Sequence, residues 1–227
     1  FFEIGNVFTR SETGTYHKGV REVTHILFGV GGKHTEQNWN RKEISYSVFD
    51  VKGAVDRLFS DLKLSDAVTT ERVSDQKLVY KLDNQIIGEL LVLPGNQKKI
   101  FDTNESLYCA ELSLTHVQEA AEKLDALKYS PVPKFPGVEF DLAIVVDSNV
   151  DAGDMTNIIR QTGTSLLKSI SIFDLFEGKS IGTDKKSIAF RLKFVDESKT
   201  LTIKDVDSII GKTVKRLEKQ FGAQLRS

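Results

Sequence analysis

Few residues of this sequence could carry out chemistry by themselves. The segment 28–35, Phe-Gly-Val-Gly-Gly-Lys-His-Thr, contains the glycines and the lysine of a phosphate-binding loop. Such a loop needs Gly-x-x-x-x-Gly-Lys followed directly by Ser or Thr. Here His34 follows Lys33, and Leu27 stands where the first glycine belongs. We therefore interpret the segment as a glycine-rich turn that follows a strand.

The sequence gives equally little support for metal or nucleophile chemistry. Cys109 lies in the apolar run 107–112, so we predict a buried, inert thiol. No pair of carboxylates is marked out as a general acid and base. The pattern predicts no catalytic residue and no metal site, and an independent hydrolase or kinase would need a catalytic set that we do not find. The histidines, which lack metal-ligand spacing with one another and with Cys109, are His17, His25, His34 and His116.

A different chemistry, the binding of an unstacked nucleobase, needs an aromatic ring beside polar side chains on an exposed surface. Strand alternation in 187–195 places Ser187 and Arg191 on the face opposite its apolar residues. If Phe173 sits at a bulge, Asp174 and Phe176 join them on this open face. The alternative is a solvated sheet face with one stray aromatic residue. The apolar residues that should point toward the helices are Ile170, Ile172, Leu175, Ile188, Phe190, Leu192 and Phe194.

These side chains require a sheet with one free face, and the C-terminal part of the chain predicts one. Its strands and helices follow in the order βαββαβ, which is the ferredoxin-like arrangement. Thr202 and Asp205 resemble a capping pair for the second helix, and Gly222 is suited to end it. The predicted strands are 140–147, 169–176, 187–195 and 223–226, and the predicted helices are 155–166 and 202–221.

The N-terminal part predicts an antiparallel sheet with helices. Asp83 and Asn84 suit the tight turn of a hairpin. Thr115 is predicted to cap the second helix, with Gln118 reaching back to it. The residues expected on the buried face of that helix are Val117, Ala121, Leu124 and Leu127. The predicted strands are 1–10, 20–30, 77–82, 85–93 and 107–114, and the first helix is 49–62.

The predicted fold class is α+β, with domains at 1–127 and 128–227. The boundary lies in the segment 127–137, which holds three of the four prolines and is expected to be an extended, stiff strap. The first part has 15 basic and 19 acidic residues, and the second has 16 and 13, so the net charge of −1 combines −4 and +3. A mildly positive second part is compatible with a polyanionic partner.

Composition also bears on the setting of the protein. No apolar run reaches the ~18 residues of a membrane span, so we expect no membrane partner. A single cysteine cannot form an internal disulfide, which favours a reducing compartment such as the cytoplasm. The only methionine is Met155, and the chain opens with Phe1. We therefore expect a piece of a longer protein, with upstream strands of the first sheet left outside it.

Five motifs of the second part point to one known family. They are Lys134-Phe-Pro-Gly-Val-Glu-Phe-Asp-Leu-Ala-Ile-Val-Val-Asp147 and the segments 172–178, 185–194, 199–202 and 221–226. In this order and spacing they resemble the anticodon-binding domain at the C-terminus of the bacterial phenylalanyl-tRNA synthetase beta subunit. The family domain is ferredoxin-like, in agreement with the order of elements. The resemblance implies that this part recognises the anticodon of tRNA(Phe).

Upstream, the segments 2–8, 49–53 and 108–112 resemble the synthetase-like domain of the same subunit, a class II core without chemistry. The arginines that hold ATP in a working class II core are missing from 1–8 and from the region near 105–114. The resemblance implies a phenylalanine–tRNA ligase, an aminoacyl-tRNA synthetase of protein biosynthesis. In it an alpha subunit binds ATP, phenylalanine and magnesium, and this part, without a cofactor, catalyses neither step. The first domain would pack against the alpha subunit and the second beta subunit of an α2β2 heterotetramer.

By the family pattern, Asp174 and Phe176 would meet the first anticodon base, the ring by stacking and the carboxylate by accepting from a guanine edge. Ser187 would approach the anticodon from the next strand. Asp174 could instead only pair with Arg191, and Lys134 could be merely solvated. The further candidates for phosphate or base contact are Lys134, Arg191 and Arg226.

Three departures from the family pattern stand out. Glu139-Phe140 replaces the usual Arg-Arg, the segment 73–76 replaces a His-Pro-Gly segment, and Phe176 stands where the family often has Tyr. Stacking survives the last change, whereas a hydroxyl contact does not. The alternative function is a ferredoxin-like regulatory module that binds a small metabolite and no RNA. Binding to RNA would weaken steeply with salt, and binding to such a metabolite would not.

Overall fold

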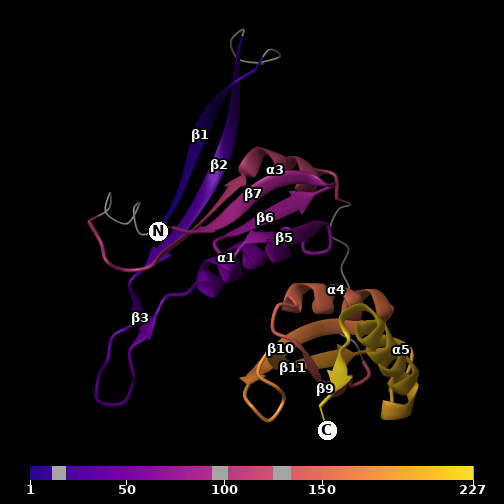
Figure 1. Cartoon of the computed structure of the whole chain (residues 1–227). Helices are drawn as coiled ribbons and strands as arrows, with labels where there is room; N and C mark the ends of the chain where they lie inside the picture. The colour runs from indigo at the N-terminus through magenta and orange to yellow at the C-terminus, as the bar shows by residue number, and fades with distance from the viewer. Residues whose placement is uncertain (12–18, 94–101, 125–133, 227) are drawn as a thin grey trace. The chain divides into compact units, whose positions relative to one another are not determined.

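A computed structural model describes residues 1–11, 19–93, 102–124 and 134–226 of the chain (Figure 1). The chain divides into two compact units, Phe1–Leu127 and Lys128–Ser227. Residues 127–133 of the predicted strap, together with His17, lie outside the described ranges.

The first unit is built on a six-stranded antiparallel sheet with the strand order β1-β2-β8-β7-β6-β5. Two helices, α1 (Val48–Asp61) and α3 (Leu114–Glu122), pack on one face of it. The strand β5 and a short pair, β3 (Lys33–Thr35) with β4 (Ile44–Ser45), were absent from the sequence prediction. The sheet strands are β1 (Phe2–Arg10), β2 (Val20–Gly31), β5 (Val68–Ser74), β6 (Lys77–Leu82), β7 (Gln85–Val92) and β8 (Leu107–Ser113).

The helical spacing read from the sequence explains how α1 packs. Val51, Val55 and Phe59 are buried one turn apart, and the Phe59 ring lies 5.7 Å from the ring of Tyr80 on the sheet. The tight turn predicted between β6 and β7 is confirmed, because Asp83 and Asn84 both have the positive φ that such a turn requires, 49° and 63°.

The prediction for the start of α3 was wrong. The helix begins at Leu114 with Ser113 as its N-cap, two residues before the expected N-cap Thr115. The Thr115 hydroxyl instead accepts the backbone N–H of Thr24 at 3.1 Å, which ties the helix to β2. Gln118 bonds forward to Glu122 rather than back to Thr115. Leu124 is 42% exposed, because it lies beyond the last turn of the helix.

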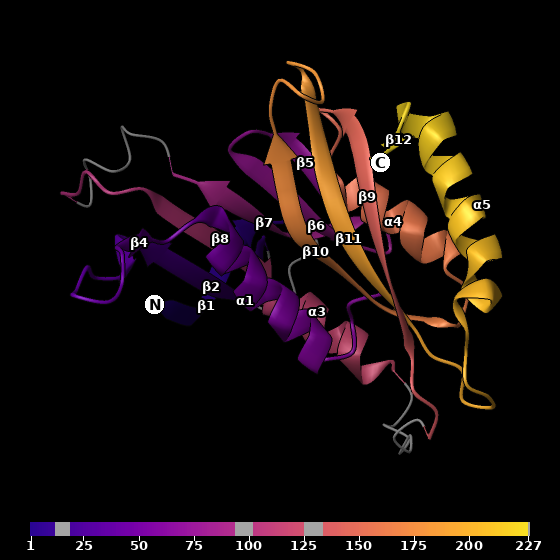
Figure 2. The same ribbon diagram turned by 90° about the horizontal axis from the view of Figure 1, so that it is seen from below.

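The second unit is a four-stranded antiparallel sheet with the order β10-β11-β9-β12, covered on one face by two helices (Figure 2). This arrangement confirms the ferredoxin-like βαββαβ prediction. The core of the second unit includes the buried Met155, Phe190 and Phe194. The elements are β9 (Val138–Asp147), α4 (Ala152–Thr162), β10 (Leu167–Glu177), β11 (Lys185–Phe194), α5 (Ile203–Phe221) and β12 (Gln224–Leu225).

The two ends of α5 follow the sequence prediction. Asp205 accepts the backbone N–H of Thr202 at 2.7 Å, so the capping pair is confirmed. Gly222 ends the helix in the left-handed region with φ of 61°, a conformation that glycine adopts without a steric penalty. The chain then turns back, and β12 pairs with β9.

The register of β10 contains the predicted bulge. Ile172 pairs with Phe190 and Asp174 pairs with the adjacent Ala189, which leaves Phe173 without a partner in the ladder.

The burial predicted for two residues of β10 was wrong. Ile172 and Leu175 are 48% and 58% exposed instead of buried, because β10 is the outer strand and the helical layer packs only against its first part, around Ile170.

Candidate nucleic-acid interface

The open face of the second sheet, opposite α4 and α5, is organised in rows of paired residues. Residues that pair across antiparallel strands lie on the same face. One row contains Phe176, Ser187 and Val145, and the next contains Asp174 with Ala189. The structure therefore brings Asp174, Phe176 and Ser187 together on the face that alternation predicted.

Phe176 carries an arginine on its ring. The turn at Gly222 and the β12–β9 pairing bring Arg226 to this sheet, where its backbone N–H donates to the Ala143 carbonyl at 2.9 Å. The Arg226 guanidinium carbon lies 4.5 Å from the centre of the Phe176 ring, within cation–π range. The predicted residues Phe176 and Arg226 thus form one unit, which we call the inner stack.

Ser187 lies on the open face but is only 2% exposed, and the neighbouring Val145 is 8% exposed. The strand order explains this burial. Phe176 is on β10 and Arg226 follows β12, so their side chains meet above β11 and β9, which lie between those strands. The prediction that Ser187 approaches a base therefore requires the inner stack to open.

Asp174 is exposed beside the inner stack. Within the part of the chain that the structure describes, its carboxylate makes no hydrogen bond or ion pair. The alternative prediction, a pair between Asp174 and Arg191, was wrong. Arg191 pairs with Asp141 and not with Asp174, because the strand register places Arg191 directly opposite Asp141 on β9. The Asp174 carboxylate is left with its full capacity to accept hydrogen bonds.

Arg191 and Asp141 form a two-pronged ion pair. The Nε and Nη2 atoms of Arg191 donate to the two carboxylate oxygens of Asp141 at 2.8 and 2.7 Å. These bonds hold the pKa of Asp141 below its ordinary value and raise the pKa of Arg191 above its own. The Arg191 guanidinium carbon also lies 4.8 Å from the centre of the Phe173 ring. We call Phe173, Arg191 and Asp141 the outer stack.

Sequence reasoning missed the outer stack as a unit. It treated Phe173 only as a bulge and assigned Asp141 no role. The antiparallel pairing of β9 with β11 contained the signal, since counting back from the paired ends places Asp141 opposite Arg191. The candidate Lys134 does not join either stack. It precedes Gly137, which lies beside Phe194, at the far end of β11 from Ser187.

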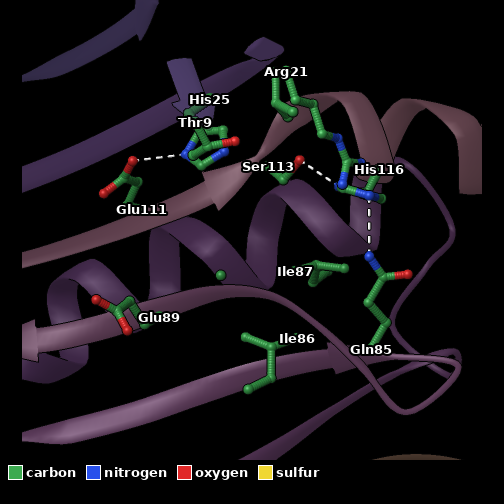
Figure 3. A pocket seen from close by; sticks show the side chains of 12 residues that line it. Thr9, Arg21, His25, Gln85, Ile86, Ile87, Glu89, Glu111, Ser113 and His116 are labelled. Carbon is green, nitrogen blue, oxygen red and sulfur yellow. Dashed lines mark hydrogen bonds and ion pairs between the residues drawn. The ribbon is translucent and has the colours of Figure 1, made fainter. Parts of the chain in front are cut away.

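The first unit offers a shallow cavity of about 430 Å³, lined by residues of β1, β2, β7 and β8 and by His116 of α3 (Figure 3). Nε2 of Gln85 lies 3.1 Å from Nε2 of His116, and Nδ1 of the same ring lies 2.6 Å from the Ser113 hydroxyl. Nearby, His25 bonds to Glu111 at 2.7 Å.

Neither unit presents an arrangement for metal or thiol chemistry in the described ranges. No group of three or more His, Cys, Asp and Glu side chains there is placed to hold a metal ion. Burial raises the pKa of the Cys109 thiol, with further contributions from Glu111 and Glu89, so its reactive thiolate form is disfavoured. Among the helices that the structure describes, none is both long and apolar enough to cross a membrane.

Two family models match the chain and together account for most of it. Residues 133–226 match the ferredoxin-fold anticodon binding domain, and residues 1–114 match the phenylalanyl tRNA synthetase beta chain CLM domain. The chain is 33% identical over 232 residues to the phenylalanine–tRNA ligase beta subunit of Bacillus subtilis and 32% identical over 232 residues to that of Clostridium acetobutylicum. It is covered to 99% in both comparisons but spans only 28% and 27% of those two relatives.

Proposed function

Since the chain belongs to the phenylalanyl-tRNA synthetase beta chain family, we propose that it acts within a phenylalanine–tRNA ligase and that its second unit binds the anticodon of tRNA(Phe). The observation that carries this proposal is a pair of neighbouring rows on the open sheet face, which places Phe176 beside the Asp174 carboxylate, a group without a partner among the described residues. An aromatic ring next to a hydrogen-bond acceptor suits an unstacked base that carries donors on its edge. The match to an anticodon-binding family favours RNA over a small metabolite as the ligand.

The proposed contacts follow from this geometry. The first anticodon base stacks on Phe176, and Asp174 accepts hydrogen bonds from its edge. Arg226 leaves the ring and contacts a phosphate, which exposes Ser187 to the base. Arg191 contributes through the outer stack, while Lys134 is a candidate for phosphate contact elsewhere on the unit. Binding energy gained here can position the distant acceptor end of the tRNA for aminoacylation.

The first unit is proposed to support catalysis by packing against other subunits. Phe2, Ile4 and Phe8 alternate along the outer strand β1 and are 70%, 54% and 63% exposed, a surface that suits a protein partner. We propose the alpha subunit and a second beta subunit of an α2β2 heterotetramer as partners. In this assembly the alpha subunit would bind ATP and magnesium and carry out both chemical steps, in the cytoplasm.

The test is the substitution Phe176→Ala in the full beta subunit, assembled with the alpha subunit. Since an aromatic–base stack contributes ~1–3 kcal/mol, we expect the affinity for tRNA(Phe) to fall about 5- to 150-fold. The matched control is Leu175→Ala, because Leu175 is 58% exposed on the opposite face of the same strand. Filter binding and aminoacylation kinetics measure both variants. Unchanged affinity and kinetics in Phe176→Ala would exclude the proposed anticodon contact.

Salt and anticodon identity separate the two candidate functions. An RNA-binding surface loses affinity as salt rises, because phosphate contacts release counterions. The wild-type assembly should also prefer tRNA(Phe) to the same tRNA with its anticodon replaced. Equal affinity for both tRNAs would mean that the second unit does not recognise the anticodon.

A further inference from the structure

The open face of the second sheet carries two arginine–aromatic stacks, and the proposed contact with the first anticodon base uses the aromatic ring of the inner stack alone. The outer stack repeats its composition, with Arg191 4.8 Å from the Phe173 ring where Arg226 is 4.5 Å from the Phe176 ring. Phe173 is 50% exposed, and the Arg191 side chain keeps 45% of its surface exposed. Both groups are therefore accessible to a ligand on this face.

The position of Phe173 in the ladder shows that the sheet does not need it for pairing. Ile172 pairs with Phe190 and Asp174 pairs with Ala189, and these two partners are consecutive on β11. Without Phe173 the pairing of β10 with β11 would be regular at this point, and Asp174 and Phe176 would keep their faces. The bulge thus adds one exposed aromatic ring to the open face without changing the inner stack.

The two stacks differ in charge. Asp141 neutralises Arg191 through both carboxylate oxygens. Arg226, in contrast, has no carboxylate partner in the described part of the chain. Two of the five N–H donors of Arg191 are used by Asp141, so three remain for a ligand. The outer stack therefore suits the flat face and polar edge of a base better than a phosphate.

The spacing of the stacks fixes how two bases could use them. Arg191 and Ser187 are four residues apart on β11, which corresponds to ~14 Å at ~3.4 Å per residue. Two bases stacked on each other are only ~3.4 Å apart. The two stacks therefore cannot hold neighbours that remain stacked, but they can hold two bases that are splayed apart, as in a single-stranded loop.

We propose that the outer stack is a second nucleobase-binding platform, which holds an unstacked nucleotide of the same loop whose first anticodon base lies on Phe176. The proposal rests on the proposed function of this sheet face and extends it to a second nucleotide. The base stacks on the Phe173–Arg191 pair and takes hydrogen bonds from the free N–H groups of Arg191. Asp141 holds the guanidinium in place and removes its net attraction for phosphate.

The experiment measures binding of tRNA(Phe) to the ligase assembled from the alpha subunit and the full beta subunit, at two salt concentrations. The variants are Phe173→Ala, Phe173→Trp, a deletion of Phe173, and Leu175→Ala as the control on the opposite face. We expect Phe173→Ala and the deletion to lose at least ~5-fold in affinity, the lower end of a base–aromatic stack, and Phe173→Trp to retain wild-type affinity. The salt dependence of Phe173→Ala should equal that of the wild type, since no phosphate contact is lost.

The outcomes distinguish this inference from the proposed function. If Phe176→Ala weakens binding and Phe173→Ala does not, the anticodon contact stands and the second platform is refuted. If neither Phe176→Ala nor Phe173→Ala weakens binding, the proposed function fails together with the second platform. Loss of affinity in the deletion but not in Phe173→Ala would also refute the platform, because the effect would then come from the altered backbone. Thermal unfolding of each variant, compared with that of Leu175→Ala, identifies any loss that reflects misfolding.

Discussion

Arg226 provides the sharpest test of how the inner stack works. Ser187 is 2% exposed beneath Phe176 and Arg226, so a base can reach it only after the guanidinium leaves the ring. The arginine then gives up a cation–π contact of ~0.5–1 kcal/mol, a factor of about 2 to 5 in affinity. In the proposed complex the arginine gains a phosphate contact instead, and the strength of that contact depends on salt.

The substitution Arg226→Gln removes both contributions. One contact to a single-stranded phosphate changes log K by ~0.7 per tenfold change in salt, which is worth about 8-fold at 50 mM and about 3-fold at 200 mM. After the released cation–π contact is subtracted, Arg226→Gln should bind tRNA(Phe) about 1.5- to 3.5-fold more weakly than wild type at 50 mM. At 200 mM the two affinities should agree within about 2-fold.

Fluorescence anisotropy with labelled tRNA(Phe) and the assembled ligase measures these affinities. Arg226→Lys keeps the charge, so its salt dependence should match that of the wild type. A second readout needs no RNA: a Ser187→Cys thiol should react slowly in the wild-type background and faster when Arg226 is replaced. A salt dependence that is the same in Arg226→Gln and wild type would refute the phosphate contact. A thiol that is already fully reactive beside the intact arginine would refute the closed stack.

Two further predictions concern stability. The Tyr80 hydroxyl is buried without a hydrogen-bond partner in the described part of the chain, and burial raises its pKa; Tyr80→Phe should therefore leave the free energy of unfolding in urea unchanged or raise it by about 1 kcal/mol. Hydrogen bonds from Thr202 and Lys199 hold the pKa of Asp205 well below its ordinary value, so its folded-state pKa lies below its unfolded one. The ionised Asp205 carboxylate therefore stabilises the folded protein fully above about pH 4, and this stabilisation is lost as pH falls through the lowered pKa. The difference in unfolding free energy between wild type and Asp205→Asn should shrink over the same range of pH.

The second unit could be predicted in detail because its signals are local. A capping pair, a left-handed glycine and uninterrupted alternation in 187–195 fix α5 and β11 within a few residues. The first unit was less accessible. Polar edge strands such as β5, whose residues are mostly exposed, have no hydrophobic alternation to read. The choice between Ser113 and Thr115 as N-cap depended on a partner in β2, far away in the chain.

In the candidate site, too, some features follow from the local sequence and others depend on distant parts of the chain. Strand alternation places Asp174, Phe176 and Ser187 on one face, because the side-chain period of a strand is a local property. Exposure is not local. Ser187 is buried by an arginine that follows the last strand, and Asp174 has no partner among the described residues because Arg191 stands opposite Asp141. Both facts follow from which strands are neighbours, and a single sequence does not contain that order directly.

The charge pattern of the open face has a consequence for specificity. Arg191 is neutralised by Asp141 and Lys185 lies 3.5 Å from Asp147, so two of the cations on the open-face rows are paired with carboxylates on β9. The departure from Arg-Arg at Glu139-Phe140 lowers the positive charge of the same strand further. This pairing reduces the sequence-independent attraction of these rows to phosphates, the attraction that dominates non-specific binding. In the proposed function, stacking and hydrogen bonds to base edges add to the phosphate contact of Arg226, and these are the contacts that would distinguish one anticodon from another.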